Sequence, residues 1–166
     1  MFIGRQNEIA KIEDFVFKSK RQILYIYGKH GVGKTSLINQ FIQKNKKLLD
    51  NKVLTLNAFN FDSLPNDFLN SEKDLLIIDD YFEFSGYNAI SMALPVSGLK
   101  NIIDNSKAKK VLLLSSEPPL FFNNSLQGRT DFLEIPPFSN QDLDNIIRHA
   151  FNDESNINFN EFYSYF

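Results

Sequence analysis

Apolar residues along the chain follow two alternating patterns, one typical of buried strands and one typical of helices. Short runs dominated by apolar residues predict five strands, at residues 23–27, 53–59, 74–80, 109–116 and 131–135. Between these runs, apolar residues recur every three or four positions, as they do along one face of a helix. The clearest helical stripes are Ile9, Ile12, Phe15 and Val16, followed by Leu37, Ile38, Phe41 and Ile42.

The alternation of strands and helices predicts the architecture. Parallel strands joined by helices form a sheet that is covered on both faces, so we expect an α/β protein with three α/β/α layers and a five-stranded parallel sheet. A further helix is predicted over residues 98–107, and Lys44, Lys46 and Lys47 are expected to end the second helix. Ser139 and Asp142 have the spacing of a capping box and predict the start of a last helix.

Charge is distributed unevenly along the chain, although the net charge is only −2. Residues 1–52 hold 11 Lys and Arg against 4 Asp and Glu, and the rest hold 7 against 16. This excess is what a polyanion site around residues 28–36 would need, or it belongs to lysines that solubilise two surface helices. An acidic chain overall gives little support for a broad nucleic-acid groove.

Composition excludes several classes of site. The 166 residues fit one domain and contain no cysteine, so disulfides, thiolate zinc sites and a cysteine nucleophile are excluded. No apolar run approaches the roughly 20 residues that span a bilayer, and the amino terminus lacks the layout of a signal peptide. We therefore expect a cytoplasmic protein that has no membrane partner.

A glycine-rich loop carries the strongest chemical signal. The stretch GKHGVGKTS fits the pattern G-x-x-x-x-G-K-[ST] and lies between a predicted strand and a predicted helix. Glycines let successive backbone N–H groups point at phosphate oxygens, while a lysine and a hydroxyl serve the terminal phosphates and Mg²⁺. Nine residues are expected to bind nucleotide: Gly28, Lys29, His30, Gly31, Val32, Gly33, Lys34, Thr35 and Ser36.

Two aspartates end the third predicted strand, in the segment LLIIDDYFEF. A carboxylate there faces the edge at which open α/β sheets bind ligands, so Asp79 is the expected Mg²⁺ ligand together with Thr35. Asp80 is the expected group that orients the attacking water, a role more often filled by the longer glutamate. Glu83 is the alternative for that role, and a structural end to the strand is the alternative for both aspartates.

Three further residues are candidates for catalysis. Ser115 and Ser116 end the fourth predicted strand, where one of them would sense the γ-phosphate or both would cap the strand. Arg129 precedes the fifth strand, where it would reach a neighbouring subunit's γ-phosphate or form a salt bridge with Asp131. His30 and His149 have no metal-like company, and we expect neither to be catalytic.

Together, these motifs resemble the αβ core of AAA+ and related STAND-type ATPases. The resemblance implies strand order 5-1-4-3-2, an adenine nucleotide with Mg²⁺, and an N-terminal box in FIGRQNEI whose Phe2, Ile3 and Gly4 pack beside the base. FIGRQNEIAKIEDF with SLQGRTDFLEIPPFS is similar to the archaeal-type ATPases. LLIIDDYFEF with LLLSSEPP is similar to the bacterial replication initiators and their regulatory homologues.

The same resemblance implies a domain division and a function. Residues 1–138 would form the nucleotide-binding core, and 139–166 would begin a helical lid that is truncated or absent, with Arg148 too early for its sensor arginine. We expect an ATP-binding domain that hydrolyses ATP slowly and assembles with itself or a protein partner, with DNA reached through a partner or a further domain. The alternative is a switch that binds ATP or ADP with negligible turnover. A small-molecule kinase fits the Asp-Asp strand end less well.

Overall fold

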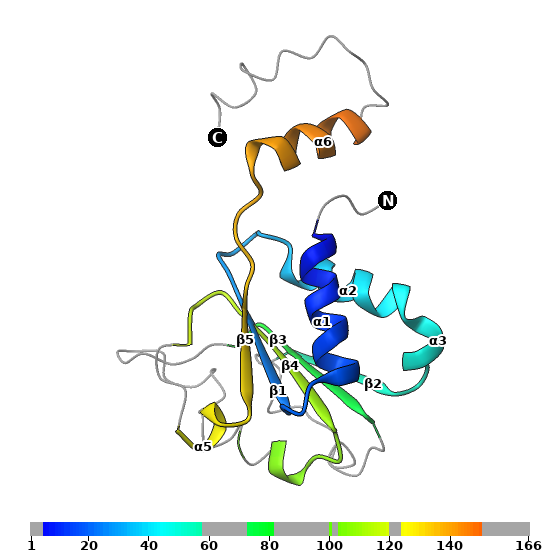
Figure 1. The fold of residues 1–166 in the computed structure, drawn as a ribbon, viewed down its shortest axis with the longest axis vertical. Coiled ribbons are helices and arrows are strands. Elements are labelled where there is room, and N and C mark those ends of the chain that lie inside the picture. The colour runs from blue at the N-terminus through cyan, green and yellow to red at the C-terminus, as the bar shows by residue number, and fades with distance from the viewer. Residues whose placement is uncertain (1–4, 58–72, 82–99, 101–102, 120–123, 151–166) are drawn as a thin grey trace.

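Five parallel strands form one sheet at the centre of the chain (Figure 1). The computed structural model describes residues 5–57, 73–81, 100, 103–119 and 124–150. The strands are β1 (Ile23–Tyr27), β2 (Val53–Asn57), β3 (Leu75–Asp79), β4 (Lys110–Ser115) and β5 (Thr130–Glu134). The helices are α1 (Gln6–Lys18), α2 (Lys34–Lys44), α3 (Lys46–Leu49), α5 (Asn124–Gln127) and α6 (Asn140–Ala150). The strand order is β2-β3-β4-β1-β5, which is the predicted order read from the other edge.

Alternate strand residues point to opposite faces of the sheet, and both faces are buried. On one face, side chains such as Leu24, Ile77 and Leu112 pack with the apolar stripes of α1 and α2. On the other face, side chains such as Ile78 and Leu113 pack with a separate buried cluster. Because both faces are covered at the centre of the sheet, the central strands β1, β3 and β4 are apolar along most of their length, which explains why they read as continuous runs.

The observed boundaries differ from the predicted ones at two helices. The lysine-rich end of the second predicted helix is a separate short helix, α3, because the chain breaks at Asn45. The Phe41 carbonyl accepts hydrogen bonds from both the Asn45 side chain, at 3.0 Å, and the Asn45 N–H, at 3.1 Å, so Asn45 closes the end of α2. The helix predicted over 98–107 is helical at 100 and 103–105 among the residues described there, and α5 was not predicted.

A strap of residues 135–139 connects β5 to α6, which stands apart from the sheet (Figure 1). The predicted capping box is confirmed, because the Asp142 N–H donates to Ser139 Oγ and the Ser139 N–H donates to Asp142 Oδ2, both at 3.1 Å. Arg5 anchors the strap to the start of α1 by donating to the Pro136 carbonyl and stacking over Phe138 at 4.2 Å. The division at residue 138 stays a prediction, since residues 151–166 lie outside the described part of the chain.

Gly28 directly follows β1 and packs against the strap so closely that no side chain fits between them. A Cβ atom there would lie 2.3 Å from the Ile135 carbonyl oxygen, a backbone atom that cannot swing away. We expect Gly28→Ala to lower the free energy of unfolding by about 1–3 kcal/mol, the usual cost of overpacking. Gly128→Ala is the matched control, because its Cβ would meet nothing within 4 Å. Equal unfolding midpoints in urea for the two variants would contradict the close contact.

Candidate nucleotide-binding site

The loop between β1 and α2 lies at the carboxyl end of the sheet and curls back toward its own start. Gly31 and Gly33 have φ angles of 83° and 88°, in the left-handed region that glycine adopts without strain. Val32 is buried in the core beneath the loop and anchors it from below. The loop therefore presents its backbone at the N-terminus of α2, where N–H groups are free to bind an anion.

Lys34 folds over the mouth of this loop. Its ammonium group donates to the carbonyls of Gly28 at 2.7 Å and Lys29 at 3.1 Å. Burial lowers the pKa of Lys34, and the carboxylates of Asp79 and Asp80 oppose that effect. The cation is thus held between the loop and two acidic side chains, as a group that binds phosphate next to a metal ion must be.

Thr35 and Asp79 come from different elements and meet at one point. The Thr35 hydroxyl donates to Asp79 Oδ2 at 2.9 Å, and Asp79 Oδ1 accepts from the Asp80 N–H at 2.9 Å. Mg²⁺ commonly takes one or two protein oxygens and completes its shell with water and phosphate oxygens. Two adjacent hard oxygens beside an open cavity fit that requirement, so these residues could hold Mg²⁺.

Asp80 is held in an unusual conformation directly after β3. Its φ angle is 53°, which is uncommon for a residue with a side chain. The Asn57 amide, at the end of the neighbouring β2, donates to Asp80 Oδ2 at 2.8 Å. Because the backbone and one carboxylate oxygen are both fixed, Asp80 has a defined direction at the edge of the site.

Two adjoining cavities lie in front of these groups. One of about 300 Å³ is lined by His30, Gly31, Gly33, Lys34, Thr35, Ser36, Asp79 and Asp80. The other, of about 180 Å³, is lined by His30, Lys34, Asp80, Tyr81, Leu114, Ser115 and Ser116. Lys34 and Asp80 border both, so the structure brings the loop, the aspartates and the two serines together.

The two serines differ in their surroundings. Ser115 is buried, and its hydroxyl accepts the Glu117 N–H at 3.1 Å, which is the strand-capping arrangement. Ser116 is half-buried on the wall of the smaller cavity. The capping role thus falls to Ser115, and the sensor role stays a prediction for the pair.

Arg129 lies at the opposite end of the sheet from the loop. Its guanidinium donates to Asp104 at 2.9 Å and to Gln22 at 3.1 Å, and Gln22 directly precedes β1. The predicted salt bridge with Asp131 is wrong, since Asp131 lies near Arg21 instead, at 3.8 Å. Arg129 is therefore not part of this chain's own cavity, and the arginine-finger role stays a prediction that concerns a neighbouring copy.

Of the two interpretations of the basic excess, the structure favours lysines on the helices over a cluster around the loop. Of the basic residues in 1–52, only Lys29 and Lys34 belong to the loop. Others lie at the ends of α1 and α2, in α3 or before β2. Phe2, Ile3, Gly4 and Glu83 lie outside the described residues, so their predicted roles stay predictions, as does that of His149, whose side chain is not described.

Asn57 is a site residue that the sequence reasoning missed. A usable signal existed, because the expected order places the second strand beside the third, and Asn57 ends the second. A polar residue at that position had to lie next to the strand that ends in Asp79. Tyr81 was also missed; its ring is fully buried and packs edge-on against Tyr25 at 6.1 Å.

The loop, the aspartates and the strand order define a P-loop NTPase. The family described as "ATPase domain predominantly from Archaea" matches residues 2–74, which is less than half of the chain. The chromosomal replication initiator protein DnaA of Bacteroides thetaiotaomicron is 41% identical over 75 residues, covering 38% of this chain and 16% of that protein.

Solved structures extend the likeness to nearly the whole chain. AMPPCP-bound DnaA from Aquifex aeolicus is 21% identical, with a TM-score of 0.65 over 93% of this chain and 53% of that one. A replication initiator DnaA bound to AMPPCP and single-stranded DNA is 20% identical, with a TM-score of 0.69 over 98% and 56%. The chain thus spans about half the length of these structures. Its fold is that of the AAA+ domains in these structures, and both predicted subfamily resemblances recur among the matches.

Among the helices that the structure describes, none is both long and apolar enough to cross a bilayer.

Proposed function

We propose that the chain is an ATP-binding AAA+-type domain that hydrolyses ATP slowly, with Mg²⁺, and couples this to assembly with copies of itself or with a partner. The observation that carries the proposal is the meeting of Thr35 and Asp79 at 2.9 Å, beside a cavity that Lys34 and Asp80 also border. A site of this composition suits a Mg-nucleotide, because it offers backbone N–H groups, one cation and two hard oxygen ligands.

Each residue has a separate task in this proposal. The loop backbone and Lys34 bind the β- and γ-phosphates, and Thr35 and Asp79 hold Mg²⁺. When bound, Mg²⁺ neutralises charge on the phosphates. Asp80 accepts a hydrogen bond from a water and orients it toward the γ-phosphorus. The water oxygen bonds to that phosphorus as the bond to the ADP oxygen breaks, the proton of the water passes to the phosphate, and ADP and inorganic phosphate leave.

The proposal also specifies the base of the nucleotide, the partner in the assembly and DNA. Adenine is supported by the family resemblance, by the lack of a guanine-reading N/T-K-x-D motif in the sequence, and by relatives solved with AMPPCP. Arg129 of a neighbouring copy would complete the site in an assembly. One DnaA relative was solved bound to single-stranded DNA, which supports DNA as a partner here.

One observation favours a second candidate, a nucleotide-dependent switch with negligible turnover. Asp80 is one methylene shorter than the usual glutamate, and Asn57 already occupies one of its carboxylate oxygens. A phosphate-release assay on the isolated chain, with and without DNA, separates the two functions. Steady release of phosphate excludes the switch.

Lys34→Ala tests nucleotide binding. Removing the ammonium group leaves the terminal phosphates without their cation, and we expect a loss of about 2–5 kcal/mol of binding free energy, measured by titration with a fluorescent ATP analogue. Lys11→Ala, an exposed lysine in α1, is the control that should bind normally. Normal affinity in the Lys34 variant would overturn the assignment of the loop.

Asp80→Asn tests turnover. The amide keeps the size of the side chain but accepts a hydrogen bond from water more weakly, so phosphate release should fall about 100-fold or more while ATP affinity is retained. Equal turnover in wild type and variant would move the role to another residue, such as Glu83.

Asn57→Ala tests the group that fixes Asp80. Without the amide at 2.8 Å, Asp80 loses its defined direction, and phosphate release should fall about tenfold at unchanged ATP affinity. Thr55→Ala, an exposed residue two positions earlier in β2, is the control. A fall of the same size in the Thr55 variant would assign the effect to the strand and not to the contact.

A further inference from the structure

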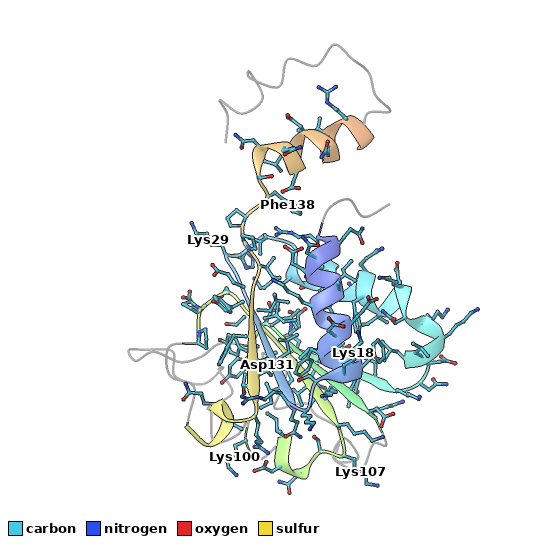
Figure 2. The ribbon with its side chains drawn as sticks, viewed as in Figure 1. Lys18, Lys29, Lys100, Lys107, Asp131 and Phe138 are labelled. Atoms are coloured by element: carbon cyan, nitrogen blue, oxygen red, sulfur yellow. The ribbon has the colours of Figure 1, made fainter. Side chains whose placement is uncertain are left out.

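The amino ends of the five strands form a face that is rich in basic residues, at the opposite end of the sheet from the phosphate loop. Every strand is preceded within three residues by at least one Lys or Arg. We call this set the amino-end face: Lys20, Arg21, Lys52, Lys73, Lys107, Lys109, Lys110 and Arg129. Figure 2 shows Lys107 at the end of the molecule opposite Lys29, which belongs to the loop.

Basic side chains of this face bridge every pair of neighbouring strands. Lys73 donates to the Asn51 carbonyl at 2.7 Å, from the start of β3 to that of β2. Lys110 donates to the Arg21 carbonyl at 2.6 Å, from β4 to β1, and Arg129 donates to the Gln22 side chain at 3.1 Å, from β5 to β1. Lys109 completes the row by an ion pair with Asp74 at 2.8 Å, from β4 to β3.

In two of these four bridges the lysine keeps its full charge, because Lys73 and Lys110 donate to backbone carbonyls and not to carboxylates. Lys109 and Arg129 each pair with a carboxylate, that of Asp74 and that of Asp104. Among the described residues, the carboxylates in or beside the face are Asp50, Asp74, Asp104 and Asp131, against eight cations. The described part of the face therefore keeps a positive surplus, whereas the described carboxyl end sets Lys29, Lys34 and Arg5 against Asp79, Asp80, Glu117, Glu134 and Glu8, the last of which pairs with Arg5.

The shape and chemistry of this face favour one kind of partner. Neighbouring strands lie about 4.8 Å apart, so the row of cations extends roughly 19 Å from β2 to β5. In the three residues before each strand start, the described chain exposes no large apolar side chain; Phe17 and Leu48 are exposed further back, in α1 and α3, and Phe132 is exposed within β5. Protein interfaces usually have an apolar centre, whereas nucleic-acid interfaces are polar and positively charged.

We propose that the amino-end face binds the phosphate backbone of a nucleic acid, at a site separate from the nucleotide cavity. Lys20 and Lys52 are the exposed lysines of the set that form no ion pair within the described residues, although the charge of Lys52 helps to lower the pKa of Asp74. The bridging cations fix the row, and the two exposed lysines, before β1 and before the edge strand β2, add charge that is not held in a bridge.

The experiment measures binding of a fluorescent oligothymidylate and of a DNA duplex across a salt series. Each phosphate contact contributes about 0.7–0.9 to the slope of log K against log salt concentration, so K20Q/K52Q should bind more weakly with a slope shallower by roughly 1.5. K11Q/R148Q removes the same charge from α1 and α6, away from the face, and should bind like the wild type. Thermal melts confirm that both variants fold.

Two further arms separate this site from the phosphate loop and from a site for acidic proteins. Lys34→Ala should keep its oligonucleotide binding, because the face does not include the phosphate loop. The proposal is overturned if the wild type binds neither DNA probe, if both double variants weaken binding equally, or if Lys34→Ala abolishes it. It is also overturned if polyglutamate, and not DNA, binds with this dependence on Lys20 and Lys52, since that result identifies an acidic protein partner.

Discussion

Parallel, in-register pairing of the strands is the constraint on which the site depends. In a parallel sheet all carboxyl ends emerge at one edge, and here the register sets Tyr27 beside Ser115 and Asn57 beside Asp79. Residues that are far apart in the sequence therefore meet without any loop having to place them. A shift of one residue in any ladder would send the core side chains to the wrong face, so the burial of both faces also fixes the geometry of the site.

The amount of the site that could be predicted follows from that constraint. Lys34, Thr35 and Asp79 were predictable because each follows the end of a strand at a spacing that the motif fixes. Their spacing in the sequence therefore determines where they lie in the fold. Asn57 escaped because its role depends on a cross-strand neighbour and carries no local pattern of its own. The fold was predictable for a simpler reason: strands that are buried on both faces are apolar throughout, and helices with one buried face are striped.

Charge was the property that the linear sequence described least well. The basic excess of residues 1–52 seemed to belong to the glycine loop because the two overlap in sequence. In a parallel strand, however, a residue before the strand and a residue after it lie at opposite ends of the sheet. Lys20 and Lys29 flank the same strand and are separated by its whole length. The sheet is therefore basic at the amino ends of its strands and carries Asp79 and Asp80 at the carboxyl ends.

The contact between Gly28 and Ile135 ties the phosphate loop to the strap. The Ile135 N–H donates to the Tyr27 carbonyl at 2.7 Å, and its own carbonyl presses against Gly28, so the first residues of the loop and of the strap share one joint. Arg5 clamps the same strap one residue further along, at Pro136. The strap therefore holds the first residues of the loop, through Ile135, and the start of α1, through Pro136, before it reaches α6.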